Sequence, residues 1–496
     1  MGQGNKNRKP RDSTRNATPS LLEKIDVYSA QKGSKNSVSI LGGTVRVLYW
    51  ESILSDSVRA SVTFTDAGNT LSTSKITRRG RRPTAKKVSA VEGLPIEGSE
   101  EVRLKFADNN GVTLNFGKTT NNSLYVNKIR NLPTGSETTD KTYMLDLAPL
   151  EWIKNDLGHT EVGKNMRGQV SDLAKRIFKD FLKTKKKLDI ERTRNKEDYQ
   201  GLNQKPIYCL NQLSTRAVSQ DVRNTGETAG YFFWETSDSY HFKSIDTLMD
   251  QDYKIKILYN ESSEGIPKGY QARALSMETD NKVNVQKKNE RGAWSNHFTS
   301  IDPFSGTVTN IFNSAEAFTK GNEVKLAGEE LPALNEAFSG GQADSDYTKK
   351  VFQLASTGQL NVGPIADQLK DSKLPNFDNA GVFNQAMMRY NQLFSSEVTI
   401  VLPGDFSLHA GDSVVVDIPQ TDITENKACG DEVDQRTSGK YLISDLCHYI
   451  TAKDTYTKLV LIRDSFGRKV TSNKGDGQSS SNANKVMDSN FLSFIK

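Results

Sequence analysis

SGKYLISDLCHYITAKDTYTKLVLIRDSF, residues Ser438–Phe466, carries the strongest β-strand pattern in this 496-residue chain. Apolar and polar residues alternate over 440–451 and again over 455–463, with the period of two that a half-buried strand requires. Lys453-Asp454 separates the two runs and supplies a turn. The stretch therefore predicts a long antiparallel hairpin in a fold that is mainly β.

Shorter runs of the same kind precede the hairpin. They begin at Tyr253, Val398 and Val414. We expect them to join the hairpin in a tube-like antiparallel β-barrel formed by 251–300 and 395–470.

A long segment, 301–394, separates the two parts of this predicted barrel. It is rich in Gly, Asn and Ser, and only short helical fragments such as Tyr347–Ala355 are expected in it. A loop of this length inside a domain is usually a functional insertion. Its role is left unassigned.

A second set of alternating runs fills the N-terminal part of the chain. The runs lie at 58–65, 101–106, 112–116, 124–129 and 143–147. Asp108–Gly111 has the composition of a hairpin turn. These strands predict another tube-like antiparallel β-barrel over 21–150, with the basic stretch 71–92 inserted as a long loop.

Between the two sets of strands the hydrophobic period changes. Val170–Leu182 follows helical spacing over three turns, and Pro206 opens a second helix. A hairpin is expected over Tyr231–Phe242, and Ser244 is expected to cap a short helix. Residues 151–250 therefore predict a small α/β module, so the fold class is mainly β with α+β parts.

Composition excludes several classes of protein. The apolar set is 35% of residues, and no run approaches the ~18 apolar residues of a membrane span. Residues 1–20 lack the apolar core of a secretory signal and are expected to be a disordered basic tail, while 471–496 is expected to be a flexible tail. Cys209, Cys429 and Cys447 form no CxxC, which favours a reducing compartment over a disulfide scaffold or a thiolate zinc site.

Positive charge is concentrated in three segments. Residues 1–20, 71–92 and 164–196 carry net charges of +4, +6 and +8, whereas the whole chain carries +6. Such segments are found where proteins contact nucleic acid. Because these segments lack interleaved aromatic residues for base stacking, we favour solvated loops or an electrostatic dock for an acidic protein.

No residue pattern predicts a catalytic, cofactor-binding or metal site. Gly111–Thr119 ends in GKT, but it has five residues between its glycines and no following helix, unlike a phosphate-binding loop. Ser413 follows a Gly-Asp turn and is interpreted as the first residue of a strand rather than a nucleophile. Neither the histidines nor the acidic loop has metal-ligand spacing. These residues are His159, His241, His297, His409, His448, and Asp422, Glu425, Asp431, Glu432, Asp434.

The segment YFFWETSDSYHF (Tyr231–Phe242) is the densest apolar feature. An aromatic platform for carbohydrate is one interpretation. Core or subunit-interface packing is the more usual role of such residues.

Five segments, in this order, resemble a known family. They are SILSDSVRASVTFTD (Ser52–Asp66), VSDLAKRIFKDFL (Val170–Leu182), GYFFWETSDSYHFKSIDTLM (Gly230–Met249), LHAGDSVVVDIP (Leu408–Pro419) and Ser438–Phe466. The series is similar to the central baseplate hub proteins of contractile-tailed, T-even-like bacteriophages, and to the late-control and secretion-spike modules related to them.

The resemblance implies a structural virion protein in the tail baseplate, assembled in the cytoplasm of the host bacterium. It implies a homotrimer whose two barrels per subunit form a pseudo-sixfold ring. The implied partners are the hexameric tail tube protein, a trimeric central spike that can bear a lysozyme, and other baseplate proteins. Genome DNA would pass through the lumen without specific binding, and no enzymatic activity, cofactor or membrane insertion is implied.

Two alternatives stay open. A cell-wall hydrolase fused to a hub would have to lie in 300–385, the only region large enough. A nucleic-acid-binding module would use the basic segments, and its affinity would fall steeply with salt.

Overall fold

The computed structural model describes residues 21–465, apart from several internal segments. Those segments are 31–35, 67–70, 74–85, 89, 95, 109, 133–140, 221–228, 260–265, 268, 282–283, 302–307, 315–348, 355–378, 419–432 and 435–436. The predicted tails, 1–20 and 471–496, lie outside the described residues. The mainly-β class with α+β parts is confirmed. The division of the chain into the predicted domains stays a prediction.

The N-terminal strands surround a first core. They are β1 (Leu21–Tyr28), β2 (Ser37–Ser39), β3 (Thr44–Ser52), β4 (Arg59–Asp66), β7 (Glu101–Ala107), β8 (Thr113–Phe116), β9 (Leu124–Leu132) and β10 (Lys141–Pro149). Alternate side chains such as Val47, Val62 and Leu145 are fully buried in this core. The predicted hairpin turn is confirmed, because the Asp108 carboxylate accepts from the Asn110 and Val112 amides and Gly111 has a positive φ of 77°.

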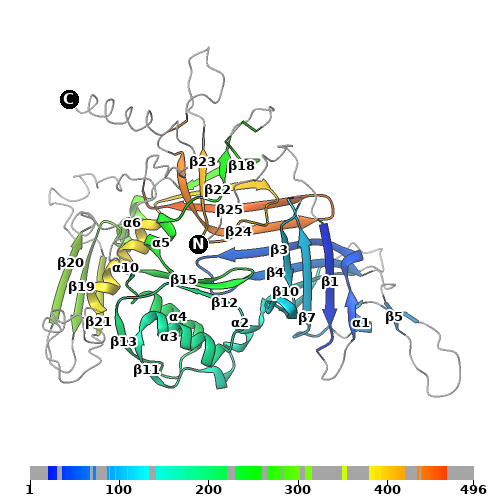
Figure 1. Ribbon diagram of the computed structural model, residues 1–496, viewed down its shortest axis with the longest axis horizontal. Helices are drawn as coiled ribbons and strands as arrows, with labels where there is room; N and C mark the ends of the chain where they lie inside the picture. Colours follow the sequence, from blue (N-terminus) through cyan, green and yellow to red (C-terminus); the bar gives the residue numbers. More distant parts are fainter. Residues whose placement is uncertain are drawn as a thin grey trace, which may run out of the picture.

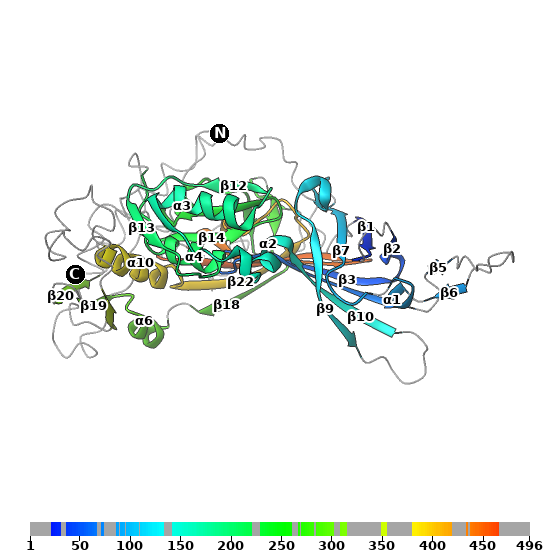
Figure 2. The ribbon, with the colours of Figure 1, turned by 90° about the horizontal axis from the view of Figure 1, so that it is seen from below.

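The predicted α/β module forms a second core. Its elements are α2 (Leu150–Lys154), η3 (Gly158–Thr160), β11 (Asn165–Gln169), α3 (Val170–Arg176), η4 (Ile177–Leu182), β12 (Lys187–Ile190), β13 (Lys196–Gln200), α4 (Pro206–Ser214), β14 (Tyr231–Glu235), β15 (Ser239–Ser244) and α5 (Ile245–Asp250). The two predicted helices, the aromatic hairpin and the Ser244 cap are confirmed, the cap by a 3.1 Å hydrogen bond from the Thr247 amide. In Figure 2, α3 and α4 lie above the level of β3, and the β9–β10 hairpin slants downward from it.

A second set of strands closes on itself. It contains β16 (Lys256–Leu258), β17 (Ala272–Arg273), β18 (Ser276–Asn281), β22 (Ser396–Pro403), β23 (Ser413–Asp417), β24 (Gly439–Thr451) and β25 (Thr455–Arg463). Strand β17 pairs with β16, and β18, which follows β17 in the chain, pairs with β22. The ring of pairings therefore runs β16–β23–β24–β25–β22 and back through β18 and β17. In it, β16 runs parallel to both of its neighbours.

Two expectations for irregular regions were wrong. Tyr347–Ala355 was expected to be helical, but Lys349–Leu354 is a strand, β21, that pairs with β19 (Ser295–Ile301). Most of β19 lies in the range assigned to the second barrel, but it pairs with β20 (Val308–Ser314) and β21 in a separate sheet. Both differences have one cause, because pairing with a partner strand outweighs weak local propensity.

The basic segment is not one continuous loop either. Its described ends form the paired strands β5 (Leu71–Thr73) and β6 (Lys86–Val88), followed by α1 (Ala90–Gly93). Residues 74–85 lie outside the description.

Two helices near the ends of the insertion were not predicted. They are α6 (Val285–Arg291), which precedes the insertion, and α10 (Asn379–Leu393), with which it ends. Within α10, Arg389 forms a buried ion pair with Asp246 at 2.6 Å, and the Tyr390 hydroxyl donates to the Tyr231 carbonyl. The insertion therefore ends in a helix that is docked on the α/β module, as its place beside α5 in Figure 1 shows.

Candidate functional site

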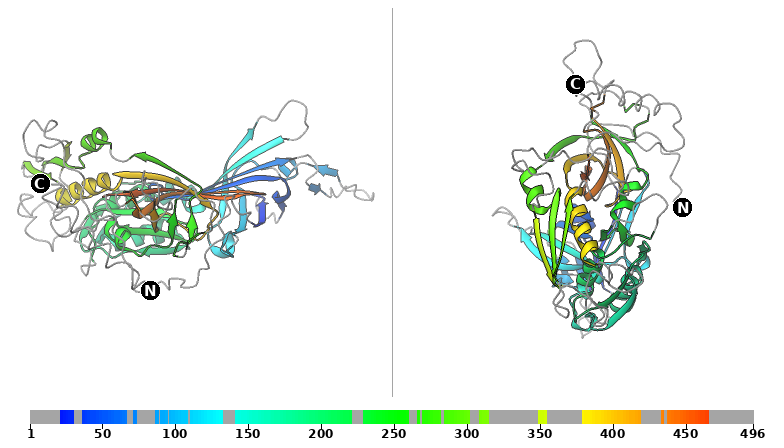
Figure 3. Two further views of the ribbon diagram at one scale, coloured as in Figure 1. Left: turned by 90° about the horizontal axis from the view of Figure 1, so that it is seen from above. Right: turned by 90° about the vertical axis from the view of Figure 1, so that its left-hand side faces the viewer.

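One antiparallel sheet connects the two sets of strands. Its order is β9–β10–β4–β3–β24–β25–β22–β18, and each neighbouring pair is antiparallel. The link is β24, whose second half pairs with β3 from Asp445↔Ser52 to Thr451↔Arg46. In Figure 1 these central strands lie one below another, and from above (Figure 3, left) β24 and β25 follow the long axis of the molecule.

One face of this sheet carries the cores, and most of the other face is open. A one-residue bulge between Ile443 and Asp445 keeps Leu446 on the core side where the other edge of β24 passes from β23 to β3. The partly or fully exposed side chains of the open face are mixed in charge and polarity. They include Arg46, Leu48, Trp50, Arg59, Lys128, Arg130, Met144, Asp146, Glu278, Glu397, Val401, Asp445, Cys447, Tyr449, Tyr456, Lys458 and Val460.

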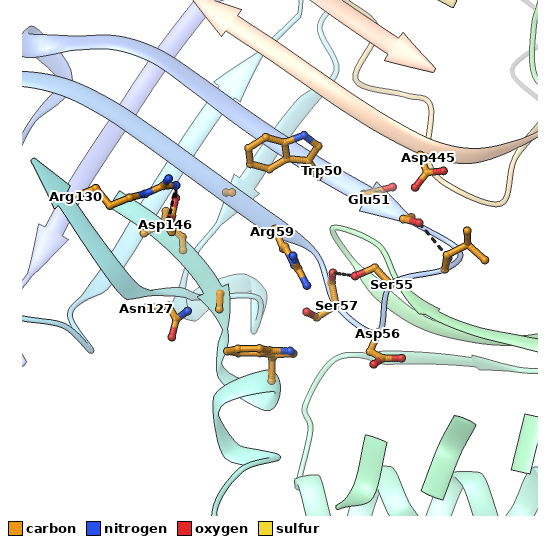
Figure 4. A pocket seen from close by; sticks show the side chains of 16 residues that line it. Trp50, Glu51, Ser55, Asp56, Ser57, Arg59, Asn127, Arg130, Asp146 and Asp445 are labelled. Atoms are coloured by element: carbon orange, nitrogen blue, oxygen red, sulfur yellow. Dashed lines mark hydrogen bonds and ion pairs between the residues drawn. The ribbon is translucent and has the colours of Figure 1, made fainter. Parts of the chain in front are cut away.

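A groove of about 770 Å³ hollows this face beside the α/β module. Trp50, Arg59 and Trp152 of α2 are among the residues that line it, and Figure 4 shows Trp50 and Arg59 at its edge. The Arg130 guanidinium donates to both oxygens of Asp146 at 2.7 Å. These contacts make the groove a polar recess with aromatic walls.

A buried carboxylate, Glu51 at the end of β3, joins the first core to the rest of the molecule. It accepts hydrogen bonds from the Tyr49 hydroxyl at 2.7 Å, the Ser237 amide at 2.9 Å and the Ala410 amide at 3.0 Å. Nδ1 of His409 lies 3.1 Å from both of its oxygens. Glu51 thus connects β3, the β14–β15 turn and the segment before β23.

The two charged partners hold each other ionised. Burial opposes the charged form of both groups. At Glu51 the charge and the hydrogen bond of His409, with the bond from Tyr49, outweigh burial and lower the pKa to about 2. At His409 the Glu51 charge outweighs burial and raises the pKa to about 9.

A second buried group, Lys186, lies nearby. Its ammonium pairs with Glu235 at the end of β14 and lies 3.7 Å from Glu151 of α2. The free oxygen of Glu235 accepts from the Val58 amide at 3.1 Å, one residue before β4. Burial disfavours the lysine charge, but the two carboxylates raise the pKa of Lys186 above its usual value. We call Glu51, His409, Lys186, Glu235 and Glu151 the charged junction.

Close packing supports the charged junction. The Trp234 indole donates to the Ala410 carbonyl at 3.0 Å, and a Cβ on Gly411 would come within 2.5 Å of the same ring. Gly411 also has a φ of 86°, which favours glycine. On the other side, the Phe406 amide donates to Asp108 at 3.1 Å, and its ring packs edge-on to Phe106 in the first core.

The residues weighed for chemistry are dispersed. Ser413 lies in β23 as predicted, fully buried, and its hydroxyl faces the Leu248 carbonyl. Gly111–Thr119 contains β8 and no α-helix follows it directly. Among the described residues, no three His, Cys, Asp or Glu side chains gather as a metal site would require. Of the acidic loop, only Asp434 lies within the described residues.

The histidines have different surroundings. His448 is fully buried, and Nδ1 lies 3.0 Å from the Thr457 hydroxyl, while burial lowers its pKa to about 4. Nδ1 of His241 lies 3.2 Å from the Asp189 carboxylate. His159 lies in η3 and His297 lies in β19. The aromatic hairpin is core, as all five residues of β14 are buried.

The charged junction was missed by sequence reasoning. A signal for Glu51 was present, because it continues the inward-facing series Val47, Tyr49 in β3. A carboxylate at a core position of a strand requires a buried partner. Nothing in the sequence identifies His409 or Ser237 as that partner, because both are far away along the chain.

Comparison with known proteins gives matches in structure only. No family model and no curated protein match the chain. In the part that the structure describes, no helix is long and apolar enough to cross a membrane.

The similar solved structures include a tail protein from Neisseria meningitidis MC58, at 10% identity and a TM-score of 0.46, covering 90% of this chain and 97% of that one. They also include the 43 kDa tail protein of prophage MuSo2 from Shewanella oneidensis, at 8% identity and 0.44, covering 90% and 100%. An E. coli type VI secretion component, c3393, is 8% identical with a TM-score of 0.40, covering 90% and 80%. All three TM-scores lie below 0.5, so the proposals below rest on the geometry of this chain and its own sequence motifs.

Proposed function

We propose that this protein is a structural component of a contractile phage tail, one subunit of a trimeric baseplate hub. The hub joins the hexameric tail tube to a trimeric central spike and forms part of the conduit for genome ejection. The observation that carries the proposal is the eight-stranded sheet that runs through both sets of strands with one face open. The ordered sequence motifs support it independently.

A sheet of this kind suits the wall of a conduit. Between the two edge strands, the backbone groups pair within the sheet, so the wall is stiff. Its open face mixes cations such as Arg59 and Lys458 with carboxylates such as Asp445 and Glu397. A wall with balanced charge would not hold DNA by neutralising its phosphates.

The charged junction suits an adapter. A ring subunit must hold its two strand units at one fixed angle, or the two ends of the sheet will not meet neighbouring copies at the required rotation. Glu51 and Lys186 are hydrogen-bonded and charge-paired to segments from distant parts of the chain. Buried polar groups of this type specify one arrangement, because every other arrangement leaves a charge without its partner.

The remaining parts of the proposal come from the sequence resemblance. The strands of 21–150 and the closed ring around β24 act as the two tube-like domains. The tail tube binds one rim of the ring, and the spike and other baseplate proteins bind the other. The protein acts in the tail baseplate of the virion after assembly in the host cytoplasm, it has no enzymatic role, and its basic segments face away from the lumen.

Mass photometry and negative-stain microscopy of the purified full-length chain test the proposal. We expect particles of three times the 55.1 kDa chain mass that appear as rings with an open centre. A chain that stays monomeric at micromolar concentration, alone and with tail-tube and spike proteins added, would contradict the proposed function.

A further inference from the structure

The groove beside the α/β module is lined by large apolar side chains that the described part of the chain does not cover. Trp50 of β3 and Trp152 of α2 are partly exposed, and Leu54, in the loop after β3, is 60% exposed. The other two of the four tryptophans, Trp234 and Trp294, are buried. Tryptophans in a recess are among the residues that most often anchor a bound protein segment.

The charged side chains of the groove favour an occupant with a positive charge. Asp56 and Asp445 both line it (Figure 4), and neither forms an ion pair with a described residue. Asp56 accepts a hydrogen bond from Asn211 at 2.8 Å, and Asp445 accepts one from the Ser444 hydroxyl at 2.8 Å. Arg59 is the one cation of the groove without an ion pair in the described part of the chain. Two carboxylates therefore face one guanidinium.

The chain itself contains a segment with matching chemistry. Residues 471–490 contain no aromatic residue, but the next five, Phe491–Ile495, read FLSFI and are followed by Lys496. Residues 1–20, at the other end, contain no aromatic residue and no Leu, Ile or Val. Of the two terminal segments outside the described residues, only Phe491–Lys496 combines clustered large apolar side chains with an adjacent cation.

The segment is tethered close enough to reach the groove. Val460 of β25 lies opposite Asp445, and Ser465, the last described residue, is about 17 Å further along at ~3.3 Å per residue. Residues 466–490 separate Ser465 from Phe491. A Gly/Ser-rich linker of this length has a root-mean-square span of about 25–30 Å. Such a tether gives the segment an effective concentration in the millimolar range at the groove of its own chain.

We infer that Phe491–Lys496 docks in the groove of its own chain. A phenylalanine ring packs against Trp50 and Trp152, and the Lys496 ammonium faces Asp56 and Asp445. The inference concerns a single subunit, so it does not depend on the proposed hub function.

Tryptophan quenching by acrylamide measures the cover in the full-length chain. F491S/F494S should uncover Trp50 and Trp152 and raise the quenching constant by about twofold, because the docked segment no longer excludes solvent from them. M487S replaces an apolar residue that precedes the segment. It is the matched control and should leave the quenching constant unchanged.

A labelled peptide of residues 486–496 measures the groove directly. Added to full-length F491S/F494S, it should bind saturably in fluorescence anisotropy. In that background L54D should weaken binding by about tenfold, and K496E in the peptide should weaken it several-fold. L202D is the matched control, because Leu202 is 73% exposed on the α/β module outside the groove. Both leucines are exposed, so equal melting temperatures are expected.

Disulfide formation tests which chain supplies the groove. S55C/S493C, in a background with Ser at 209, 429 and 447, should oxidise within one chain, giving a single-chain band without free thiols. Lys458 is exposed on the open face, away from the groove, and within reach of the same tether. K458C/S493C is therefore the control and should oxidise about tenfold more slowly.

The contrary outcomes are distinct. Unchanged quenching in F491S/F494S, or peptide binding that L54D and L202D affect equally, would overturn the docking. A disulfide between two chains would overturn the assignment to the segment's own chain. None of these results bears on the proposed function, which fails only if the unmodified chain forms no ring.

Discussion

The carboxylate of Glu51 sits where the first core, the α/β module and the segment before β23 meet. It is fully buried, and its oxygens receive hydrogen bonds from three elements besides its pairing with His409. A pair of this kind contributes little net stability relative to apolar residues of the same size. Its consequence is specificity, since removal of one partner leaves a buried charge unmatched.

Replacement of His409 by Ala should therefore be strongly destabilising. We expect the free energy of unfolding to fall by about 3–5 kcal/mol, because Glu51 loses its counter-charge but stays buried. Urea unfolding followed by tryptophan fluorescence measures the change. Lys254→Ala, which breaks the more exposed 2.6 Å pair with Asp412, is the control and should cost about 1 kcal/mol or less. Equal losses in the two variants would contradict this reasoning.

Buried His448 should make the protein sensitive to acid. Burial lowers its pKa to about 4 from the usual 6.5, so below pH 6.5 the unfolded chain binds a proton that the folded chain refuses. The free energy of unfolding should fall as the pH drops from 6.5 to 4, by up to about 3 kcal/mol at 1.36 kcal/mol per pH unit.

His448→Gln should lose most of this slope, and the exposed His159→Gln should keep it. Chemical denaturation at a series of pH values between 4 and 7 provides the comparison. An unchanged slope in His448→Gln would show that another group causes the acid sensitivity. Glu51 is not that group. Its pKa is lowered from 4.5 to about 2, so its contribution to the free energy of unfolding is complete above pH 4.5 and is lost only as the pH falls toward 2. Most of that contribution is therefore still present at pH 4.

At the scale of elements, the regular strands and helices could be predicted from periodicity. The β24–β25 hairpin, the β7–β8 turn and the helix that begins at Val170 all carry local patterns that fix their type. The strands β19 and β21 could not be predicted in this way. Neither has a strong alternating pattern of its own, and they pair with each other in the structure. The Glu51–His409 pair and the β3–β24 pairing that makes the sheet continuous are contacts over more than a hundred residues, which a single sequence does not specify.

The segment before β23 depends on one glycine. Gly411 combines a φ of 86° with a Trp234 ring that leaves no room for a Cβ. Gly411→Ala should cost about 1–3 kcal/mol from backbone strain and more from displacement of the ring. Thermal unfolding and near-ultraviolet circular dichroism would detect both effects. Gly42→Ala is the control, since a Cβ there would meet open space, and comparable losses at both glycines would exclude the ring contact as the cause.

For the whole molecule, β24 is the strand on which several cores depend. It contributes Tyr441 and Leu446 to the second core, Ile450 to the first, and Leu442 to the cluster with Phe232 and Trp234 in the α/β module. Parts that share one strand should not unfold separately, because loss of that strand removes a wall from each core at once.

We therefore expect one unfolding transition, with far-ultraviolet circular dichroism and tryptophan fluorescence giving the same urea midpoint.

The variant Cys447→Pro tests this expectation, because Cys447 lies in the middle of β24 between β3 and β25. Proline removes a ladder hydrogen bond and does not fit a central strand, so the free energy of unfolding should fall by about 3 kcal/mol or more. The urea midpoint should fall for both probes together. Ala452→Pro, at the exposed turn after β24, should have a much smaller effect. Two separate midpoints, or a Cys447→Pro variant in which only one probe shifts, would mean that the strand units fold independently. A hub made of independently folding units would not hold the two edges of its sheet at the fixed rotation that a closed ring requires.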